Sequence, residues 1–189
     1  MAAFGCLGLA EGDEVVSEGV VNGDVCTLVA TLDGSEASIC YRTLRRKEDL
    51  PALHALCRGC LGQDAWTLEG LRGELERECT VCEVIEVSGE GLVGFVIAST
   101  VVDEVSLLQI ATRPSWRGKG LATRLLSRVF GQLVRQGFRV VYLEVRRSNI
   151  AARSFYERCG FVVCGKRKGY FSKPIEDAVL MELSLPLGA

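Results

Sequence analysis

A short glycine-rich loop, Arg117-Gly118-Lys119-Gly120-Leu121-Ala122, has the residue types that bind phosphate. It lies between a predicted strand and a long helical pattern, where the free N–H groups and the dipole of a helix N-terminus attract anions. Glycine at positions 118 and 120 lets the backbone approach phosphate oxygens with no Cβ in the way. The loop matches neither the Walker nor the dinucleotide pattern, so an ordinary glycine turn before a helix is an equal interpretation of this segment alone.

Glu144 ends a predicted apolar strand, on which Val140, Tyr142 and Glu144 share one face. A carboxylate there either pairs with a neighbouring arginine or acts as a general base in a partly dry cleft. The second reading is favoured because open α/β sheets bind ligands outside the carboxyl ends of their strands. Tyr156 lies on the apolar stripe of the next predicted helix. It is either a core aromatic residue or a general acid for a departing thiolate.

The hydrophobic periodicity predicts the elements that must position these residues. Strands are expected at residues 25–32, 39–44, 81–87, 92–102, 107–112, 138–145, 161–164 and 178–185. Helices are expected at residues 48–57, from a Thr67 cap onward, at 118–136 with Gly137 as its C-cap, and at 149–159 with Ser148 or Asn149 as its cap. This order predicts an α+β domain of the three-layer type, a central mixed sheet with flanking helices.

Charge divides the chain into two parts. Residues 1–38 contain seven acidic side chains and no Lys or Arg, so the remainder carries a surplus of five positive charges. We interpret residues 1–38 as an acidic extension, with disorder as one reading, and residues 39–189 as the single folded domain. The surplus suits an anionic small ligand but is too weak for direct nucleic-acid binding. No membrane span or targeting signal is recognised, which predicts a cytoplasmic protein without a membrane partner.

Nine cysteines, an odd number, predict free thiols. Two pairs, Cys57/Cys60 and Cys79/Cys82, have the spacing of a zinc ribbon. The first pair falls on a predicted helix and the second at the start of a strand, which favours buried thiols. We therefore expect no metal, and a zinc-binding or regulatory module remains the alternative.

Together these residues resemble the GCN5-related N-acetyltransferase (GNAT) superfamily, and residues 110–183 resemble its RimI group of protein N-alpha-acetyltransferases. The resemblance covers about residues 39–185. It rests on Arg117-x-x-Gly120-x-Ala122, Leu143-Glu144-Val145-Arg146-x-Ser148-Asn149-x-Ala151-Ala152-x-x-x-Tyr156-Glu157-x-x-Gly160-Phe161, Arg167-x-x-Tyr170 and Glu176-Asp177-Ala178-x-x-Met181, with Trp66-Thr67 and Asp103-Glu104 upstream.

The resemblance implies the GNAT fold, with a mostly antiparallel, splayed sheet, and acetyl-CoA as co-substrate. By the same resemblance, Glu144 is the catalytic base and Tyr156 the catalytic acid. The implied cofactor contacts are Ile110, Ala111, Thr112, Arg117, Gly118, Lys119, Gly120, Leu121, Ala122, Thr123 and Asn149.

The implied reaction is acetylation of a protein N-terminal amine, with the N-terminal alanine of a ribosomal protein as the family's usual acceptor. Trp66 and Tyr170 are the implied substrate contacts, and Phe171 stands where the RimI group usually has a second tyrosine. A lysine side chain or a small-molecule amine remains open as the acceptor.

Overall fold

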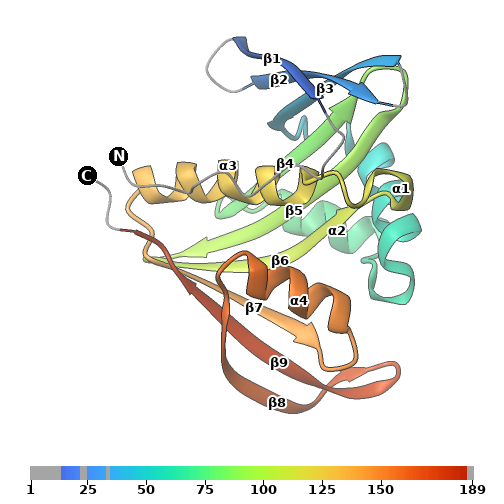
Figure 1. Cartoon of the computed structure of the whole chain (residues 1–189). Helices are drawn as coiled ribbons and strands as arrows, with labels where there is room; N and C mark the ends of the chain where they lie inside the picture. The colour runs from blue at the N-terminus through green and yellow to red at the C-terminus, as the bar shows by residue number, and fades with distance from the viewer. Residues whose placement is uncertain (1–13, 22–24, 33–34, 187–189) are drawn as a thin grey trace. The chain divides into compact units, whose positions relative to one another are not determined.

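The computed structural model describes the backbone of residues 14–21, 25–32 and 35–186, and side chains from residue 37 to 186 (Figure 1). The chain divides into two compact units. Unit 1 comprises Met1–Ile97 and Gln109–Val129, and unit 2 comprises Ala98–Leu108 and Phe130–Ala189. No helix among the described residues is long and apolar enough to cross a membrane.

Unit 1 contains an antiparallel run of strands. The order is β1 (Glu14–Val21), β2 (Val25–Leu32), β3 (Ser35–Thr43), β4 (Thr80–Val87), then the first part of β5 (Gly91–Val101) and the last part of β6 (Glu104–Thr112). The register runs from Ile39↔Val87 to Thr43↔Glu83 between β3 and β4. The predicted extension thus supplies β1, β2 and the start of β3. The boundary predicted at residue 38 falls inside β3.

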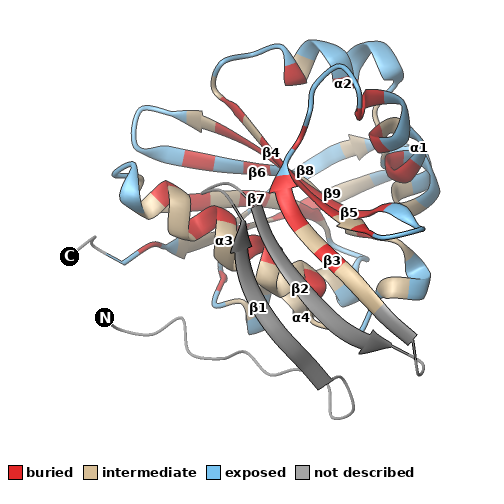
Figure 2. Cartoon of the chain, turned by 90° about the horizontal axis from the view of Figure 1, so that it is seen from above, coloured by how far each residue is buried: buried red, intermediate tan, exposed pale blue. Residues whose placement is uncertain are grey.

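Two helices, α1 (Leu50–Leu61) and α2 (Leu68–Leu75), build the core of unit 1 with the strands. Their inward residues Leu53 and Leu71 are fully buried in one cluster with Val84, Phe95 and Ile97. Figure 2 shows both helices with buried and exposed stretches, the pattern of amphipathic surface helices. As predicted, Thr67 caps α2, because its hydroxyl accepts a hydrogen bond from the Gly70 N–H at 3.1 Å.

The strands of unit 2 are the last part of β5, the first part of β6, β7 (Val140–Arg146), β9 (Ile175–Ser184) and β8 (Val162–Ser172), in that order. The unit also contains α4 (Ile150–Arg158) and the end of α3 (Leu121–Arg135). The β6–β7 ladder is parallel, from Glu104↔Val140 to Leu107↔Leu143. The β7–β9 and β8–β9 ladders are antiparallel. The predicted α+β class and the mixed, mostly antiparallel sheet are therefore confirmed.

Several predicted boundaries are wrong for identifiable reasons. The strand predicted at residues 161–164 is the 11-residue β8, whose exposed Lys166, Arg167 and Lys168 break the apolar pattern. β9 begins at Ile175, before the predicted residue 178. α3 begins at Leu121 and not at residue 118, because Gly118 and Gly120 have φ values of +80° and +70°, outside the helical region.

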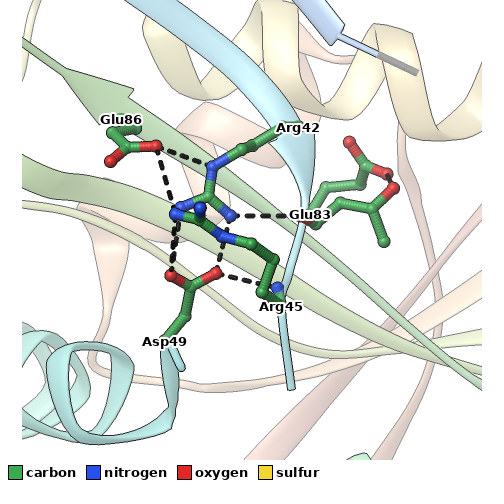
Figure 3. A network of polar contacts seen from close by, with 6 residues as sticks. Arg42, Arg45, Asp49, Glu83 and Glu86 are labelled. Atoms are coloured by element: carbon green, nitrogen blue, oxygen red, sulfur yellow. Dashed lines mark hydrogen bonds and ion pairs between the residues drawn. The ribbon is translucent and has the colours of Figure 1, made fainter. Parts of the chain in front are cut away.

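A polar network joins β3, β4 and the start of α1 in unit 1 (Figure 3). Arg42 forms a two-pronged ion pair with Asp49, at 2.6 Å and 3.1 Å, and its Nε donates to Glu86 at 2.7 Å. The Asp49 carboxylate also accepts the Arg45 N–H at 2.8 Å. The Arg42 and Asp49 side chains are only 10% and 8% exposed, so this pair is close to fully desolvated.

This burial makes unit 1 sensitive to acid. Burial alone would raise the pKa of Asp49, but the hydrogen bonds from Arg42 and from the Arg45 backbone outweigh it, and the pKa is lowered. A carboxyl group with a lowered folded-state pKa stabilises the protein above its unfolded pKa of about 3.9, and this stabilisation is lost as pH falls through the folded value.

We expect Asp49→Asn to lower the free energy of unfolding at pH 7 by roughly 3 kcal/mol, the lower end of the cost of breaking a buried ion pair, because it removes the buried counter-charge of Arg42 and leaves only the part-exposed Glu86 beside it. Urea unfolding of wild type and variant across the pH range measures the effect. The difference should be constant above about pH 5 and shrink below about pH 4. A difference that grows as the pH is lowered would contradict this assignment.

Candidate active site

The predicted phosphate loop connects β6 to α3 in unit 1. After Thr112 a short turn, η2 (Pro114–Trp116), leads to Gly118 and Gly120, both with positive φ. The first helical bond of α3 runs from the Arg124 N–H to the Gly120 carbonyl at 3.1 Å. The N–H groups of the turn before Arg124 therefore precede the intrahelical ladder, as at an anion-binding helix N-terminus.

The Arg117 side chain is anchored to its own unit. Its Nε donates to the Thr112 carbonyl at 3.0 Å, and the guanidinium also hydrogen-bonds the Cys60 thiol on α1. The Arg117 N–H donates to the Pro114 carbonyl. Arg117 thus fixes the loop to the end of β6, and its predicted contact with a cofactor stays a prediction.

Two buried polar atoms on the last part of β6 have no hydrogen-bond partner among the described residues. They are the hydroxyl oxygen of Thr112, a residue only 7% exposed, and the Oε1 of Gln109. The Gln109 amide nitrogen, in contrast, donates to the Asp64 carbonyl at 3.2 Å. Since buried polar groups are nearly always paired, these two atoms mark a segment that can satisfy the polar groups of a ligand.

For the other residues of unit 1 that were predicted to contact the cofactor or substrate, the structure shows only their packing and burial. Ala111 and Trp66 pack against the hydrophobic cluster beneath α1 and α2. Leu121 is buried, as the first residue of α3, whereas Ile110, Lys119, Ala122 and Thr123 are half-buried.

In unit 2, Glu144 at the end of β7 is held by two residues of β8. Arg167 pairs with its carboxylate at 2.6 Å, and the Tyr170 hydroxyl donates to it. The Arg167 guanidinium also lies 5.5 Å from the centre of the Tyr170 ring. The Glu144 side chain remains 28% exposed. The two donors leave further lone pairs on the carboxylate, which can still accept a proton or bind an ammonium group.

The contact with Glu144 changes the acidity of Tyr170. The hydrogen bond to Glu144 raises the pKa of Tyr170, because only the protonated phenol can donate to the carboxylate. Burial raises the pKa further, because it disfavours the charged phenolate. Sequence reasoning foresaw an arginine partner for Glu144 only as the alternative to a base. The partner, Arg167, is 23 positions away in the chain, and spacing gave no sign of the pairing.

Two side chains, Asn149 and Glu176, accept backbone N–H groups at the start of α4. Asn149 caps the helix, its side-chain oxygen accepting the Ala152 N–H at 3.1 Å, which confirms the predicted capping role. The Glu176 carboxylate accepts the Ser148 N–H and pairs with Arg146 at 3.3 Å. The hydrogen bonds from Ser148 and the Arg146 cation lower the pKa of Glu176.

Tyr156 lies on α4 in an aromatic cluster. Its ring is 5.4 Å from Phe155 and 5.6 Å, edge-on, from Phe161, which in turn contacts Phe130. Burial raises the pKa of Tyr156. The phenol therefore keeps its proton at neutral pH, as a general acid must.

Of the cysteines whose side chains the structure describes, Cys57 and Cys82 are buried and Cys164 is exposed. Cys57 and Cys60 both lie within α1, and Cys82 lies in β4. In the part of the chain that the structure describes, no three His, Cys, Asp or Glu side chains are grouped to hold a metal ion. Cys6 and the side chain of Cys26 lie outside that part.

In chain order, a glycine turn before a helix N-terminus, a part-exposed carboxylate on the next strand and a protonated phenol on the next helix match the residue types predicted for an acyltransferase. Residues 48–161 match the acetyltransferase (GNAT) family, and this chain belongs to it.

Two bacterial relatives of this chain carry the same activity in their names. The ribosomal protein bS18-alanine N-acetyltransferase of Haemophilus influenzae is 42% identical over 93 residues, 48% of this chain and 63% of the relative. The protein of the same name from Escherichia coli is 35% identical over 98 residues, 51% of this chain and 66% of the relative. These alignments cover slightly less than two thirds of each relative's length.

Solved structures agree on the fold. The crystal structure of the Escherichia coli ribosomal-protein-S18-alanine N-acetyltransferase matches with a TM-score of 0.71 and 27% identity, over 80% of this chain and 96% of that one. Ard1 from Thermoplasma volcanium matches with a TM-score of 0.70 and 23% identity, over 78% of this chain and 98% of that one. The GNAT fold is thereby confirmed.

The protonation state of Tyr156 can be measured directly. We expect its ring-carbon NMR signal to remain at the phenol position at pH 10, where an ordinary tyrosine is about half ionised, because burial penalises the phenolate. A pH titration of ¹³C-tyrosine-labelled protein gives the midpoint, with Tyr156→Phe assigning the signal. A midpoint at or below 10 would refute the proposed shift.

Proposed function

We propose that this protein is an acetyl-CoA-dependent N-alpha-acetyltransferase that acetylates the N-terminal alanine of a ribosomal protein. The observation that carries the proposal is Glu144, a part-exposed carboxylate at the carboxyl end of β7, held by Arg167 and Tyr170. The names of the bacterial relatives supply the acceptor.

The residues of unit 1 fit acetyl-CoA. Its pyrophosphate would lie on the N–H groups of residues 118–123, where the positive φ of Gly118 and Gly120 suits close approach. Its pantetheine amides would pair with backbone groups of residues 110–112, and the unpartnered Thr112 hydroxyl and Gln109 carbonyl would gain partners. In unit 2, the side-chain nitrogen of Asn149 stays available for a contact, since its oxygen serves the helix cap.

Acetyl-CoA supplies the acetyl group as a thioester, and the protein's own residues move the protons. An N-terminal amine has a pKa of about 8 and is largely protonated at neutral pH. Glu144, directly or through water, takes one proton so that the nitrogen can bond to the acetyl carbon. A backbone N–H of residues 110–112 stabilises the charge on the acetyl oxygen. As the carbon–sulfur bond breaks, Tyr156 would give its proton to the sulfur, and the second proton that leaves the amine nitrogen would restore the Tyr156 phenol, directly or through water.

The identity of the amine that receives the acetyl group is the most specific element of the proposal. GNAT proteins that act on spermidine share this fold at 22% identity, which says nothing about the acceptor of this chain. A lysine or small-molecule amine is therefore the competing acceptor. A cytoplasmic location, as predicted from the sequence, would give the enzyme access to new ribosomal proteins.

The acceptor and the two catalytic roles can be tested in one assay. We expect acetyl transfer to peptides with a free N-terminal alanine and none to the same peptides with a blocked N-terminus and an internal lysine. Glu144→Gln and Tyr156→Phe should each lower kcat by roughly 10²- to 10⁴-fold, the usual contribution of a general base or acid. The Kd for acetyl-CoA should change little in either variant. Activity on blocked peptides alone would exclude the N-alpha assignment, and wild-type turnover in both variants would exclude the roles.

The cofactor site has its own test in Thr112→Val. Removing a buried, unpartnered hydroxyl should leave the free energy of unfolding unchanged or raise it by about 1 kcal/mol. If that hydroxyl binds acetyl-CoA, the Kd measured by calorimetry should rise roughly 3- to 10-fold, the value of one hydrogen bond.

Thr80→Val is the matched control. Thr80 is a buried strand threonine of the same unit, but its hydroxyl donates to Glu74 at 2.8 Å. This control should lower the free energy of unfolding by about 1 kcal/mol and leave the Kd for acetyl-CoA unchanged. Equal affinities in wild type and Thr112→Val would remove Thr112 from the cofactor site.

A further inference from the structure

Two adjacent residues of β8 reach the same face of β7, which a regular strand does not allow. Glu144 and Arg146 are two positions apart in β7 and so share one face. The Tyr170 hydroxyl bonds Glu144, and the Phe171 ring lies 4.2 Å from the Arg146 guanidinium. Because successive side chains of a strand point to opposite faces, an uninterrupted β8 would turn one of these two residues away.

The interruption is a bulge in the β8–β9 ladder. The register runs from Arg167↔Ala178 directly to Phe171↔Glu176. Three residues of β8 (Lys168, Gly169 and Tyr170) therefore oppose the single Asp177 of β9. Bulges of this kind re-aim side chains next to active sites. This bulge turns Tyr170 to the face that holds Glu144.

Two features hold the bulge in place. Gly169 has a φ of +60°, which side-chain-bearing residues rarely adopt. Its N–H donates to the Asp177 carboxylate at 2.9 Å, so the donor freed by the broken ladder is satisfied by a side chain. Asp177 also receives the Arg147 N–H on its backbone carbonyl, which connects the bulge to the segment that follows β7.

The bulge lies directly beside the residue that forms the Arg167–Glu144 ion pair. Arg167 is the last regular residue before the bulge, and its register partner is Ala178. On β9, the same Ala178 pairs on its other side with Arg146. Arg146, Ala178 and Arg167 are thus aligned across β7, β9 and β8, and the long Arg167 side chain crosses β9 to reach Glu144 at 2.6 Å.

We propose that Asp177 and Gly169 are positioning residues for the acceptor side of the reaction, because they hold the bulge that aims Tyr170, with Arg167, at Glu144. The inference rests on the proposed function for its consequence in catalysis. Its structural part, the contact between Tyr170 and Glu144, is independent of any activity.

The experiment compares Asp177→Ala with Asp177→Asn. Asparagine keeps an oxygen that can accept the Gly169 N–H, whereas alanine has none. In Asp177→Ala we expect the Tyr170 titration midpoint, assigned with Tyr170→Phe in ¹³C-tyrosine-labelled protein, to fall toward the ordinary value of about 10. In Asp177→Asn it should stay at the wild-type value. These titrations report the Tyr170–Glu144 contact. If Asp177 only stabilised the fold, its substitution would leave the Tyr170 midpoint unchanged.

The kinetic readout follows the same pattern. With a free-N-terminus alanine peptide, Asp177→Ala should lower kcat/KM by about tenfold or more, because small misplacements of catalytic groups are costly. The KM for acetyl-CoA should stay within about twofold, and Asp177→Asn should lie close to wild type. If Asp177→Ala does not fold, Gly169→Ala serves instead. Its new Cβ has open space around it, so only the positive φ is penalised.

The outcomes separate the two proposals. An unchanged Tyr170 midpoint in Asp177→Ala, or equal losses of kcat/KM in Asp177→Ala and Asp177→Asn, would overturn the positioning role. A wild-type protein with no acetyl transfer to any peptide would overturn the proposed function. The shift of the Tyr170 midpoint would then still test the bulge.

Discussion

Unit 1 is organised around a buried carboxylate. Glu83 of β4 is 2% exposed, and it accepts hydrogen bonds from Thr43 of β3 at 2.6 Å and Arg128 of α3 at 3.0 Å. A charge this deeply buried is tolerated only when it is paired, so the three elements must keep their mutual positions. Because α3 is fixed in this way, its N-terminus and the Gly118–Gly120 turn before it are fixed too. The geometry of the proposed phosphate loop therefore depends on the Arg128–Glu83 ion pair, about two helical turns away.

In unit 2, by contrast, side chains are positioned by an irregular edge strand, β8. β8 is the last strand of its sheet, and it carries two register breaks and a basic run. An edge strand has no neighbour on one side, so it can bulge without disrupting a second ladder. The same irregularity discourages edge-to-edge pairing and directs Tyr170 at Glu144. Helix packing thus positions the proposed cofactor loop, whereas an irregular strand register positions Tyr170 and Arg167 around Glu144, the proposed base.

Much of the site was visible in the sequence because it depends on local rules. The two glycines before α3, the Thr67 and Asn149 caps and the apolar run that ends at Glu144 follow from backbone sterics and periodicity over a few residues. The extent of β8 was missed because its charged residues face solvent on one side and Glu144 on the other, so no alternation of apolar and polar residues marks the strand.

Residue types and short spacings were enough to indicate the family, the fold class, most elements after residue 38 and the candidates for binding phosphate or moving a proton, whereas β1 (Glu14–Val21) was not predicted. The contacts that those residues make became visible only in the folded protein. It anchored Arg117 on Thr112 and Cys60, left the Thr112 hydroxyl without a partner, and brought Arg167 and Tyr170 to Glu144. The contacts of Arg167 and Tyr170 with Glu144 join segments that are distant in the chain, and they depend on strand register and on a bulge. A one-residue change of register would turn every side chain of the strand to the other face. Spacing along the chain therefore cannot specify these contacts.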